Sequence, residues 1–414
     1  MAGRLVAACL VLVAASVRAE EWPQWRGPTA DNCAPAGATA PVAWSEDEGL
    51  AWNVPVPGRG HSSPTLVGPR IHLTTADADA QTQSLLVFER ASGKLLRTVV
   101  VHEGGLPDKI HPNNSHASST VASDGQRVFA LFCNRGAPWV TAFTLEGEQL
   151  WQEPAGKFEP RQFEFGFGSS PMVVDDVVIV ATEYDGPESG VYALDAATGK
   201  QRWRASRPQG LSYSTPVPLT VDGRTLIVMS GNRQLAAYDA ATGAEAWSVS
   251  GSTFATCGTM VGDTRRGLAF ASGGFPGSFT LAVKLDGDHA VVWENTVKSY
   301  EQSLLLAGEY LYPTADNGGA FCLRASDGDE QWKRRLSGPF SASPVLVGDR
   351  IYATNEAGTT FVFAASPEKC DLLAENRLGN SAFATPAPAD DRLYHRYAKD
   401  VDGRRQEFLA AIGE

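Results

Sequence analysis

The sequence lacks the short motifs that mark the most common catalytic sites. It contains no Gly-x-Ser-x-Gly elbow, no His-Glu-x-x-His motif and no phosphate-binding P-loop, so the usual signs of a serine hydrolase, a zinc protease or a nucleotide hydrolase are missing. The Trp-Asp dipeptide is also absent, which disfavours a WD40 propeller. The sequence therefore predicts no catalytic residues and leans against an enzyme, without deciding the question.

Cysteine is scarce, with six in 414 residues. No two lie close enough in sequence to suggest a metal site, and none is predicted. Five would remain after removal of an N-terminal signal, an odd number that leaves at least one thiol unpaired within a monomer. We expect most of the five to be small buried hydrophobic residues: Cys33, Cys133, Cys257, Cys322 and Cys370.

The first 19 residues carry the pattern of an export signal. Arg4 precedes an apolar run at 5–15, and Ala19 ends a Val-Arg-Ala cleavage pattern. The run is too short for a stable membrane span. Cleavage after Ala19 predicts a periplasmic or secreted protein. Lipid attachment at Cys9 is disfavoured because it would leave almost no apolar region before the cut, and an uncleaved N-terminal anchor is a further alternative.

Positive charge is in short supply. Lys and Arg number 35 against 47 Asp and Glu, a net charge of −12. Loss of Arg4 and Arg18 with the signal would take the net charge to −14. Such an acidic body argues against nucleic acid and anionic membrane as partners.

One phrase recurs along the chain: Ser-Pro, an apolar run, an Asp or Gly turn, a second apolar run, and a strand pattern that ends in Trp. The clearest copies occupy residues 170–203 and 215–247. Eight openings recur at intervals of 40 to 56 residues, a period that suits four short strands per unit. The openings are Ser63-Pro64, Ser119-Thr120, Ser170-Pro171, Thr215-Pro216, Gly258-Thr259, Ser303-Leu304, Ser343-Pro344 and Thr385-Pro386.

These residue types predict an all-β fold, an eight-bladed β-propeller of four-stranded antiparallel blades. Proline suits a strand edge facing a channel, Asp-Gly pairs suit tight turns, and a Trp on the outer strand can fill the wedge between blades. The last unit lacks its Trp strand, and residues 50–54 supply one, so we expect the N-terminal strand to close the ring. The prediction is a propeller domain at 44–414 after an extended lead-in at 20–43; seven blades or a disordered lead-in are the alternatives.

Residues 193–203, Ala-Leu-Asp-Ala-Ala-Thr-Gly-Lys-Gln-Arg-Trp, closely resemble the repeat of the PQQ-like propeller family. This resemblance covers nearly the whole chain after the signal. It implies either a quinone-dependent alcohol or sugar dehydrogenase with PQQ and Ca²⁺, or a protein similar to the propeller lipoprotein of the outer-membrane β-barrel assembly machinery. The dehydrogenases typically carry adjacent cysteines near the quinone, which this sequence lacks, so no cofactor is expected.

Equivalent positions in the repeats predict a ring of side chains at one mouth of the channel. These positions lie three or four residues before the second residue of each opening. Such a ring suits a small-molecule or peptide site, although the same side chains could simply fill the channel. Its members are His61, His116, Phe167, Tyr213, Thr256, Glu301, Phe340 and Phe383. A second candidate is the polar loop around His111, Asn113 and Asn114, whose alternative reading is an ordinary surface turn.

The leading hypothesis is thus an exported, non-catalytic and monomeric propeller that binds a protein, a peptide or a saccharide. The alternatives are a PQQ-dependent oxidoreductase and an outer-membrane protein assembly factor.

Overall fold

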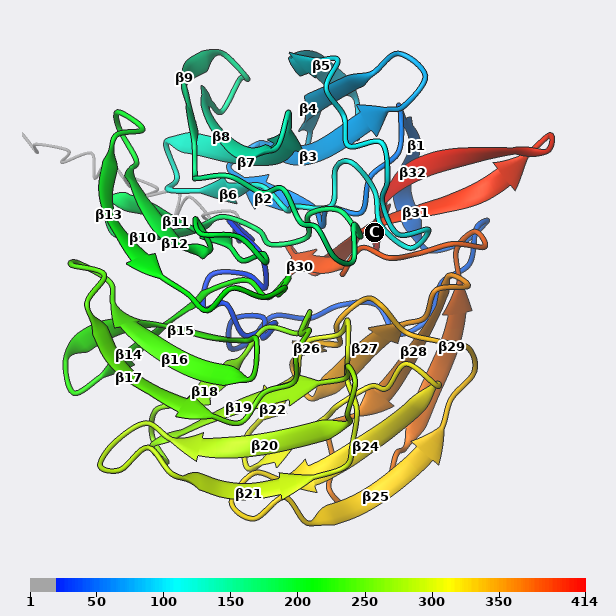
Figure 1. The fold of residues 1–414 in the computed structure, drawn as a ribbon. Helices are drawn as coiled ribbons and strands as arrows, with labels where there is room; N and C mark the ends of the chain where they lie inside the picture. The colour runs from blue at the N-terminus through cyan, green and yellow to red at the C-terminus, as the bar shows by residue number, and fades with distance from the viewer. Residues whose placement is uncertain (1–19) are drawn as a thin grey trace, which may run out of the picture.

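The computed structural model describes residues 20–414, and within them all regular secondary structure is β-strand. Thirty-two strands form eight four-stranded antiparallel sheets, which Figure 1 shows arranged as blades around a central axis. The predicted eight-bladed propeller is confirmed, and the seven-bladed alternative is wrong. No helix in the described part of the chain is long and apolar enough to cross a bilayer. The predicted signal and Cys9 lie outside the described residues.

Blades 1 to 7 each run from an inner to an outer strand in chain order. Blades 1 to 4 comprise β2 (Thr65–Val67), β3 (Arg70–Asp77), β4 (Thr82–Glu89), β5 (Leu95–Glu103), β6 (Ala122–Ser123), β7 (Arg127–Asn134), β8 (Ala137–Thr144), β9 (Gln149–Pro154), β10 (Met172–Val174), β11 (Val177–Thr182), β12 (Gly190–Asp195), β13 (Gln201–Ser206), β14 (Val217–Val221), β15 (Arg224–Gly231), β16 (Gln234–Asp239) and β17 (Glu245–Ser250). Blades 5 to 7 comprise β18 (Val261–Asp263), β19 (Leu268–Gly273), β20 (Phe279–Lys284), β21 (Val291–Asn295), β22 (Leu306–Ala307), β23 (Tyr310–Leu311), β24 (Gly319–Arg324), β25 (Glu330–Arg335), β26 (Val345–Val347), β27 (Arg350–Thr354), β28 (Thr359–Ala364) and β29 (Leu372–Arg377).

Blade 8 closes the ring with strands from both ends of the chain. It comprises β30 (Ala387–Ala389), β31 (Arg392–Val401), β32 (Arg404–Ile412) and, as its outer strand, β1 (Leu50–Val56). Trp52 pairs with Ala411 across the β1–β32 ladder. Its indole donates a hydrogen bond to Arg90 O of blade 1 at 3.2 Å. The predicted closure is confirmed, and no open edge separates the first blade from the last.

A repeated Trp joins one blade to the next at several junctions. Its indole N–H donates to a backbone carbonyl in the turn of the following blade at five junctions, with N···O distances of 2.8–3.2 Å. These tryptophans are Trp52, Trp151, Trp203, Trp293 and Trp332. At Gly199 and Gly243 the turn has the Asp-x-x-Thr-Gly phrase and the Trp ring of the preceding blade lies against the glycine, so the phrase and the Trp form one packing unit across the blade boundary.

The turn glycine is required by this packing, which gives a first prediction. Gly199 has a φ of +74°, and a Cβ there would lie 2.6 Å from Trp151 Cε3. Gly223 has the same φ but nothing within 4 Å of such a Cβ. Gly199→Ala should therefore destabilise the fold by about 1–3 kcal/mol more than Gly223→Ala, since only the first overpacks a neighbour. Equal losses in urea unfolding of the two variants would disprove the packing argument.

A ring of side-chain hydroxyls binds the inner strands around the channel. At seven junctions, the backbone N–H of a Ser or Thr in one blade donates to the matching hydroxyl of the next blade at 2.9–3.1 Å. We call these residues the hydroxyl girdle: Ser63, Thr120, Ser170, Thr215, Thr259, Ser303, Ser343 and Thr385. The Thr259 hydroxyl is the exception, because it accepts a hydrogen bond from Trp25 Nε1 instead, at 3.3 Å.

The lead-in segment lies across the end of the channel away from the side where the inner strands begin. Trp22 bridges Leu66 of blade 1, and the Gln24 side chain accepts a hydrogen bond from Val173 N of blade 3. Arg26 is buried and donates to the backbone oxygens of Thr259 and Leu304 at 3.3 and 2.7 Å. The segment is therefore ordered against the ring, and it brings the Trp25 side chain into the channel.

Candidate functional site

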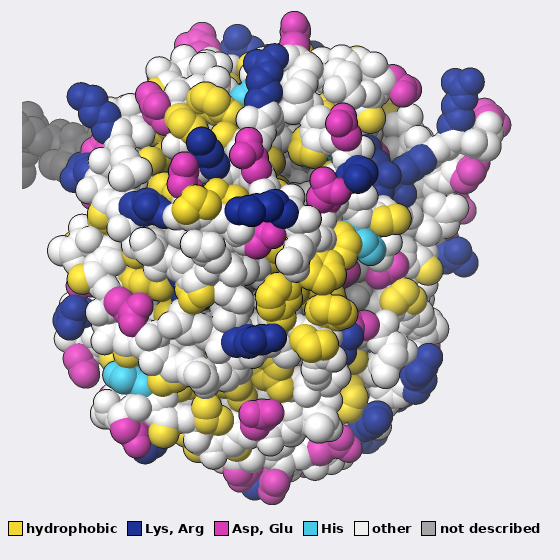
Figure 2. Space-filling view, viewed as in Figure 1, with side chains coloured by type: hydrophobic (Ala, Val, Ile, Leu, Met, Phe, Trp, Pro, Cys, Tyr) yellow, Lys and Arg dark blue, Asp and Glu magenta, His cyan; other side chains and the backbone are white. Residues whose placement is uncertain are grey.

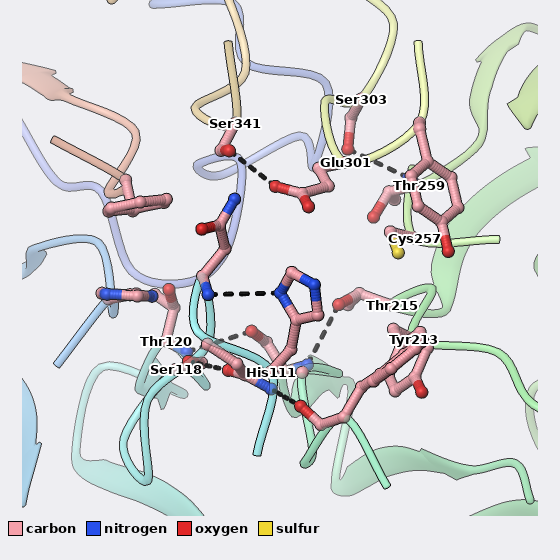
Figure 3. A pocket seen from close by; sticks show the side chains of 18 of the residues that line it. His111, Ser118, Thr120, Tyr213, Thr215, Cys257, Thr259, Glu301, Ser303 and Ser341 are labelled. Atoms are coloured by element: carbon pink, nitrogen blue, oxygen red, sulfur yellow. Dashed lines mark hydrogen bonds between the residues drawn. The ribbon is translucent and has the colours of Figure 1, made fainter. Parts of the chain in front are cut away.

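The open mouth of the channel holds a cavity of about 220 Å³. Each of the eight blades contributes the residue that lies two positions before its girdle hydroxyl, and all eight of these residues line the cavity. We call this set the mouth ring: His61, Ser118, Gly168, Tyr213, Cys257, Glu301, Ser341 and Phe383. Figure 3 shows several of them converging from different blades. The fixed position before each hydroxyl explains the convergence, because the girdle holds the eight inner strands in one register.

The floor and one wall come from other segments. Trp25 and five girdle residues, among them Thr215 and Thr259, form the floor. The loop between β5 and β6 supplies the wall with His111, Asn113 and Asn114. This loop is held by the Asn114 side chain, which donates to Phe165 O at 2.7 Å. The polar loop and the channel mouth, predicted as two candidates, thus contribute to a single cavity.

Four members of the sequence-predicted ring line this cavity: His61, Tyr213, Glu301 and Phe383. The other four do not. His116 and Phe167 line a separate cavity of about 10 Å³, and Thr256 and Phe340 are buried.

The alternation of side chains along the segment before each inner strand explains this difference for three of the four residues. Phe167, Thr256 and Phe340 each lie three positions before a girdle hydroxyl, so their side chains point away from the side faced by residues two positions before it. His116 lies four positions before Thr120. The predicted ring is defined from the second residue of each opening, which is a girdle hydroxyl in blades 2 and 5 and the residue after it elsewhere. Counting from the hydroxyl would have found Ser118, Gly168, Cys257 and Ser341; Trp25 had no comparable signal.

Glu301 is the only carboxylate in the cavity lining, which contains no Lys or Arg. Burial raises its pKa, the hydrogen bond from Ser341 lowers it, and the negative charges of Glu356 and Asp316 raise it further. The Ser341 hydroxyl lies 2.5 Å from Glu301 Oε2 and 2.7 Å from Glu356 Oε1. The site therefore places two carboxyl groups around one hydroxyl.

Burial favours the neutral form of three other groups of the lining. The His61 ring stacks on Phe383 at a centroid distance of 4.4 Å, and burial, together with the charge of Arg59, holds its pKa well below the usual range. Burial raises the pKa values of the Cys257 thiol and the Tyr213 hydroxyl. Cys257 is thus a protonated thiol, and the cavity offers no activated nucleophile.

An aromatic surface borders the cavity. Phe163 lies 5.5 Å from Phe165, 6.0 Å from Phe254 and 5.8 Å from Phe275, measured between ring centroids. Phe165 also lines the cavity, and Phe275 is 45 % exposed. We call these four residues the aromatic crest. Figure 2 shows hydrophobic side chains gathered near the middle of the same face.

The lining does not fit a quinone cofactor with calcium. PQQ carries three carboxyl groups, but no Lys or Arg lines the cavity to pair with them. Among residues 20–414, no three His, Cys, Asp or Glu side chains are grouped to hold a metal ion. Ca²⁺ prefers several carboxylate ligands, and the lining supplies one.

The fold and the cavity define a class: a closed eight-bladed propeller whose own N-terminal segment blocks one end of its channel and leaves a small cavity at the other. The model of the family described as outer membrane protein assembly factor BamB matches residues 136–274 and 278–368, more than half of the chain. The chain belongs to this family.

Known proteins agree with this assignment. The outer membrane protein assembly factor BamB of Bordetella pertussis is 27% identical over 292 residues, which cover 65% of this chain and 69% of that protein. The crystal structure of BamB from Moraxella catarrhalis has a TM-score of 0.61 at 13% identity and covers 87% of this chain and 99% of that one. A europium-containing methanol dehydrogenase has a TM-score of 0.67 at 11% identity and covers 95% of this chain and 90% of that one. These structural likenesses extend the shared fold to a dehydrogenase.

Proposed function

We propose that this protein is an exported, non-catalytic propeller that acts as an outer-membrane protein assembly factor and holds a protein partner at the mouth of its channel. The observation that carries the proposal is the aromatic crest beside the cavity. Large exposed aromatic groups on a rigid scaffold are typical of protein interaction sites. Membership in the assembly-factor family favours a protein as the partner, over a saccharide, and favours the periplasm as the location.

The backbone of the crest supports the same interpretation. Phe163 has a φ of +54°, which is uncommon for a bulky aromatic residue and costs conformational energy. Such strain concentrates at binding sites, where the surrounding structure maintains it for function. Phe163 is 36 % exposed, so the strained backbone presents an apolar ring to the surface.

Two measurements on the full chain test the proposed function. In the cell envelope, we expect the protein to co-purify with outer-membrane assembly proteins after mild crosslinking. In solution, we expect no dye-linked oxidation of alcohols or sugars after addition of PQQ and Ca²⁺, because the lining does not complement that pair. Turnover with the quinone, without any envelope partner, would overturn the proposal in favour of an oxidoreductase.

A further inference from the structure

The Ser341 hydroxyl has one proton to donate and contacts two carboxyl groups. It lies within hydrogen-bond distance of both Glu301 and Glu356, yet it can donate to only one of them. Both contacts are satisfied when Glu301, whose pKa is raised by burial, holds a proton and donates it to the Ser341 oxygen, while Ser341 donates to Glu356. Without a bound cation, this geometry favours a proton on Glu301 in place of a negative charge.

Nearby charges do not remove the need for this proton. Lys298 is the cation that acts on the pKa of Glu301, and its charge lowers that pKa. However, Lys298 forms a salt bridge of 3.0 Å with Asp316. The groups that act on Glu301 are thus Glu356, Asp316 and Lys298, two acids and one base. The surroundings of Glu301 carry an excess of negative charge that a bound cation would balance.

The rest of the lining suits a cation as well. Tyr213 and Phe383 from different blades line the walls, and Trp25 lies at the floor, whereas the Tyr300 ring is already covered by Lys298 Nζ at 5.3 Å from its centroid. Aromatic faces attract ammonium and guanidinium groups, most strongly where water is excluded. The cavity of about 220 Å³ has room for a long side chain.

We propose that the cavity binds a Lys or Arg side chain of a protein segment, with Glu301 as its counter-ion, while the aromatic crest contacts the apolar residues beside it. This inference rests on the proposed function, since it names the chemistry of the partner. The crest selects a protein segment over a free amine, because it lies directly outside the cavity and offers apolar contact there. Binding of the cation replaces the carboxyl proton, which leaves to the buffer.

The test is calorimetric titration of the full chain with the peptide acetyl-Phe-Arg-Phe-amide. The control is the same peptide with citrulline in place of arginine, which keeps the shape of the side chain and removes its charge. We expect the arginine peptide to bind at least about tenfold more tightly, because a buried charge pair is lost with citrulline. Titration in two buffers of different ionisation enthalpy should show proton release with the arginine peptide and none with the citrulline peptide. Equal affinities of the two peptides, or no binding of either, would overturn the inference.

Variants locate the effect. Glu301→Gln should weaken the arginine peptide about tenfold and abolish proton release, with the citrulline peptide unaffected. The matched control is Glu164→Gln, a 52 % exposed carboxylate on the same face, which should change neither. If Glu301→Gln does not fold, proton release by the unaltered chain still decides the question. Free arginine should bind more weakly than the tripeptide, and CaCl₂ should not compete with it. If free arginine or Ca²⁺ binds more tightly than the tripeptide, the ligand of the cavity is a small cation and the inference of a protein segment is wrong.

Failure here can be separated from failure of the proposed function. If crosslinked envelope partners are recovered with the unaltered chain and equally with Glu301→Gln, the propeller binds a protein but not through a basic side chain. If no envelope partner is recovered at all, the proposed function itself fails.

Discussion

Glu183→Ala is expected to lower the free energy of unfolding by about 3–5 kcal/mol, because it leaves a buried guanidinium without its counter-ion. Glu183 Oε1 accepts a hydrogen bond from Arg207 Nε at 2.7 Å, and both side chains are 0% exposed. Arg207 also donates to the Gln234 side chain and to Tyr238 Oη in blade 4. The pair therefore joins blades 3 and 4 in the buried interior.

Urea unfolding of the full chain measures this effect. The matched control is Glu164→Ala, which breaks a surface pair with Lys109 and should cost no more than about 1 kcal/mol. The double variant Glu183→Leu with Arg207→Met should recover most of the loss, since it removes both charges. A loss for Glu183→Ala no larger than for Glu164→Ala would show that the buried pair is not needed for stability.

Trp203→Ala is expected to cost about 3–5 kcal/mol, the usual result of removing a buried aromatic side chain. Trp203 is 8% exposed and donates its indole N–H to Ala240 O of the next blade at 3.0 Å. Trp203→Phe keeps most of the ring but loses the hydrogen bond, so it should cost about 1 kcal/mol from that source. Thermal or urea unfolding gives both values.

Trp247 provides the control for the hydrogen bond. Its ring stacks on His289 at 5.0 Å, but its buried indole N–H has no partner within the described residues. Trp247→Phe should therefore cost less than Trp203→Phe. If the two substitutions cost the same, the indole hydrogen bond does not contribute to the junction between blades.

The fold could be predicted from the sequence because its information is local and repeated. A turn followed by a Trp, as in Asp195–Trp203, recurs from blade to blade. Each copy predicts one turn and one contact between blades. Closure by β1 followed from a count, since the last unit lacked its Trp strand and residues 50–54 supplied one. Such evidence survives divergence in a single copy, because the other blades carry the same pattern.

The candidate site could be predicted only in part. A one-residue difference of phase in the segment before an inner strand moves a side chain from the cavity to the interior, as Phe340 and Ser341 show. Trp25 could not be placed because the lead-in carries no repeat, and its position depends on contacts with distant blades. The link between Glu301 and Glu356 joins two blades through Ser341, and no local pattern in the sequence indicates it.

The central claim is that the face with the aromatic crest and the cavity binds a protein partner. Site-specific photo-crosslinking in cells tests it most directly, with the crosslinking residue placed either at Phe275 on the crest or at Leu150 on outer strand β9, which are 45 % and 49 % exposed. We predict a specific envelope adduct from position 275 and none from position 150. An adduct from position 150 alone would place the partner on the rim of the propeller and contradict the account.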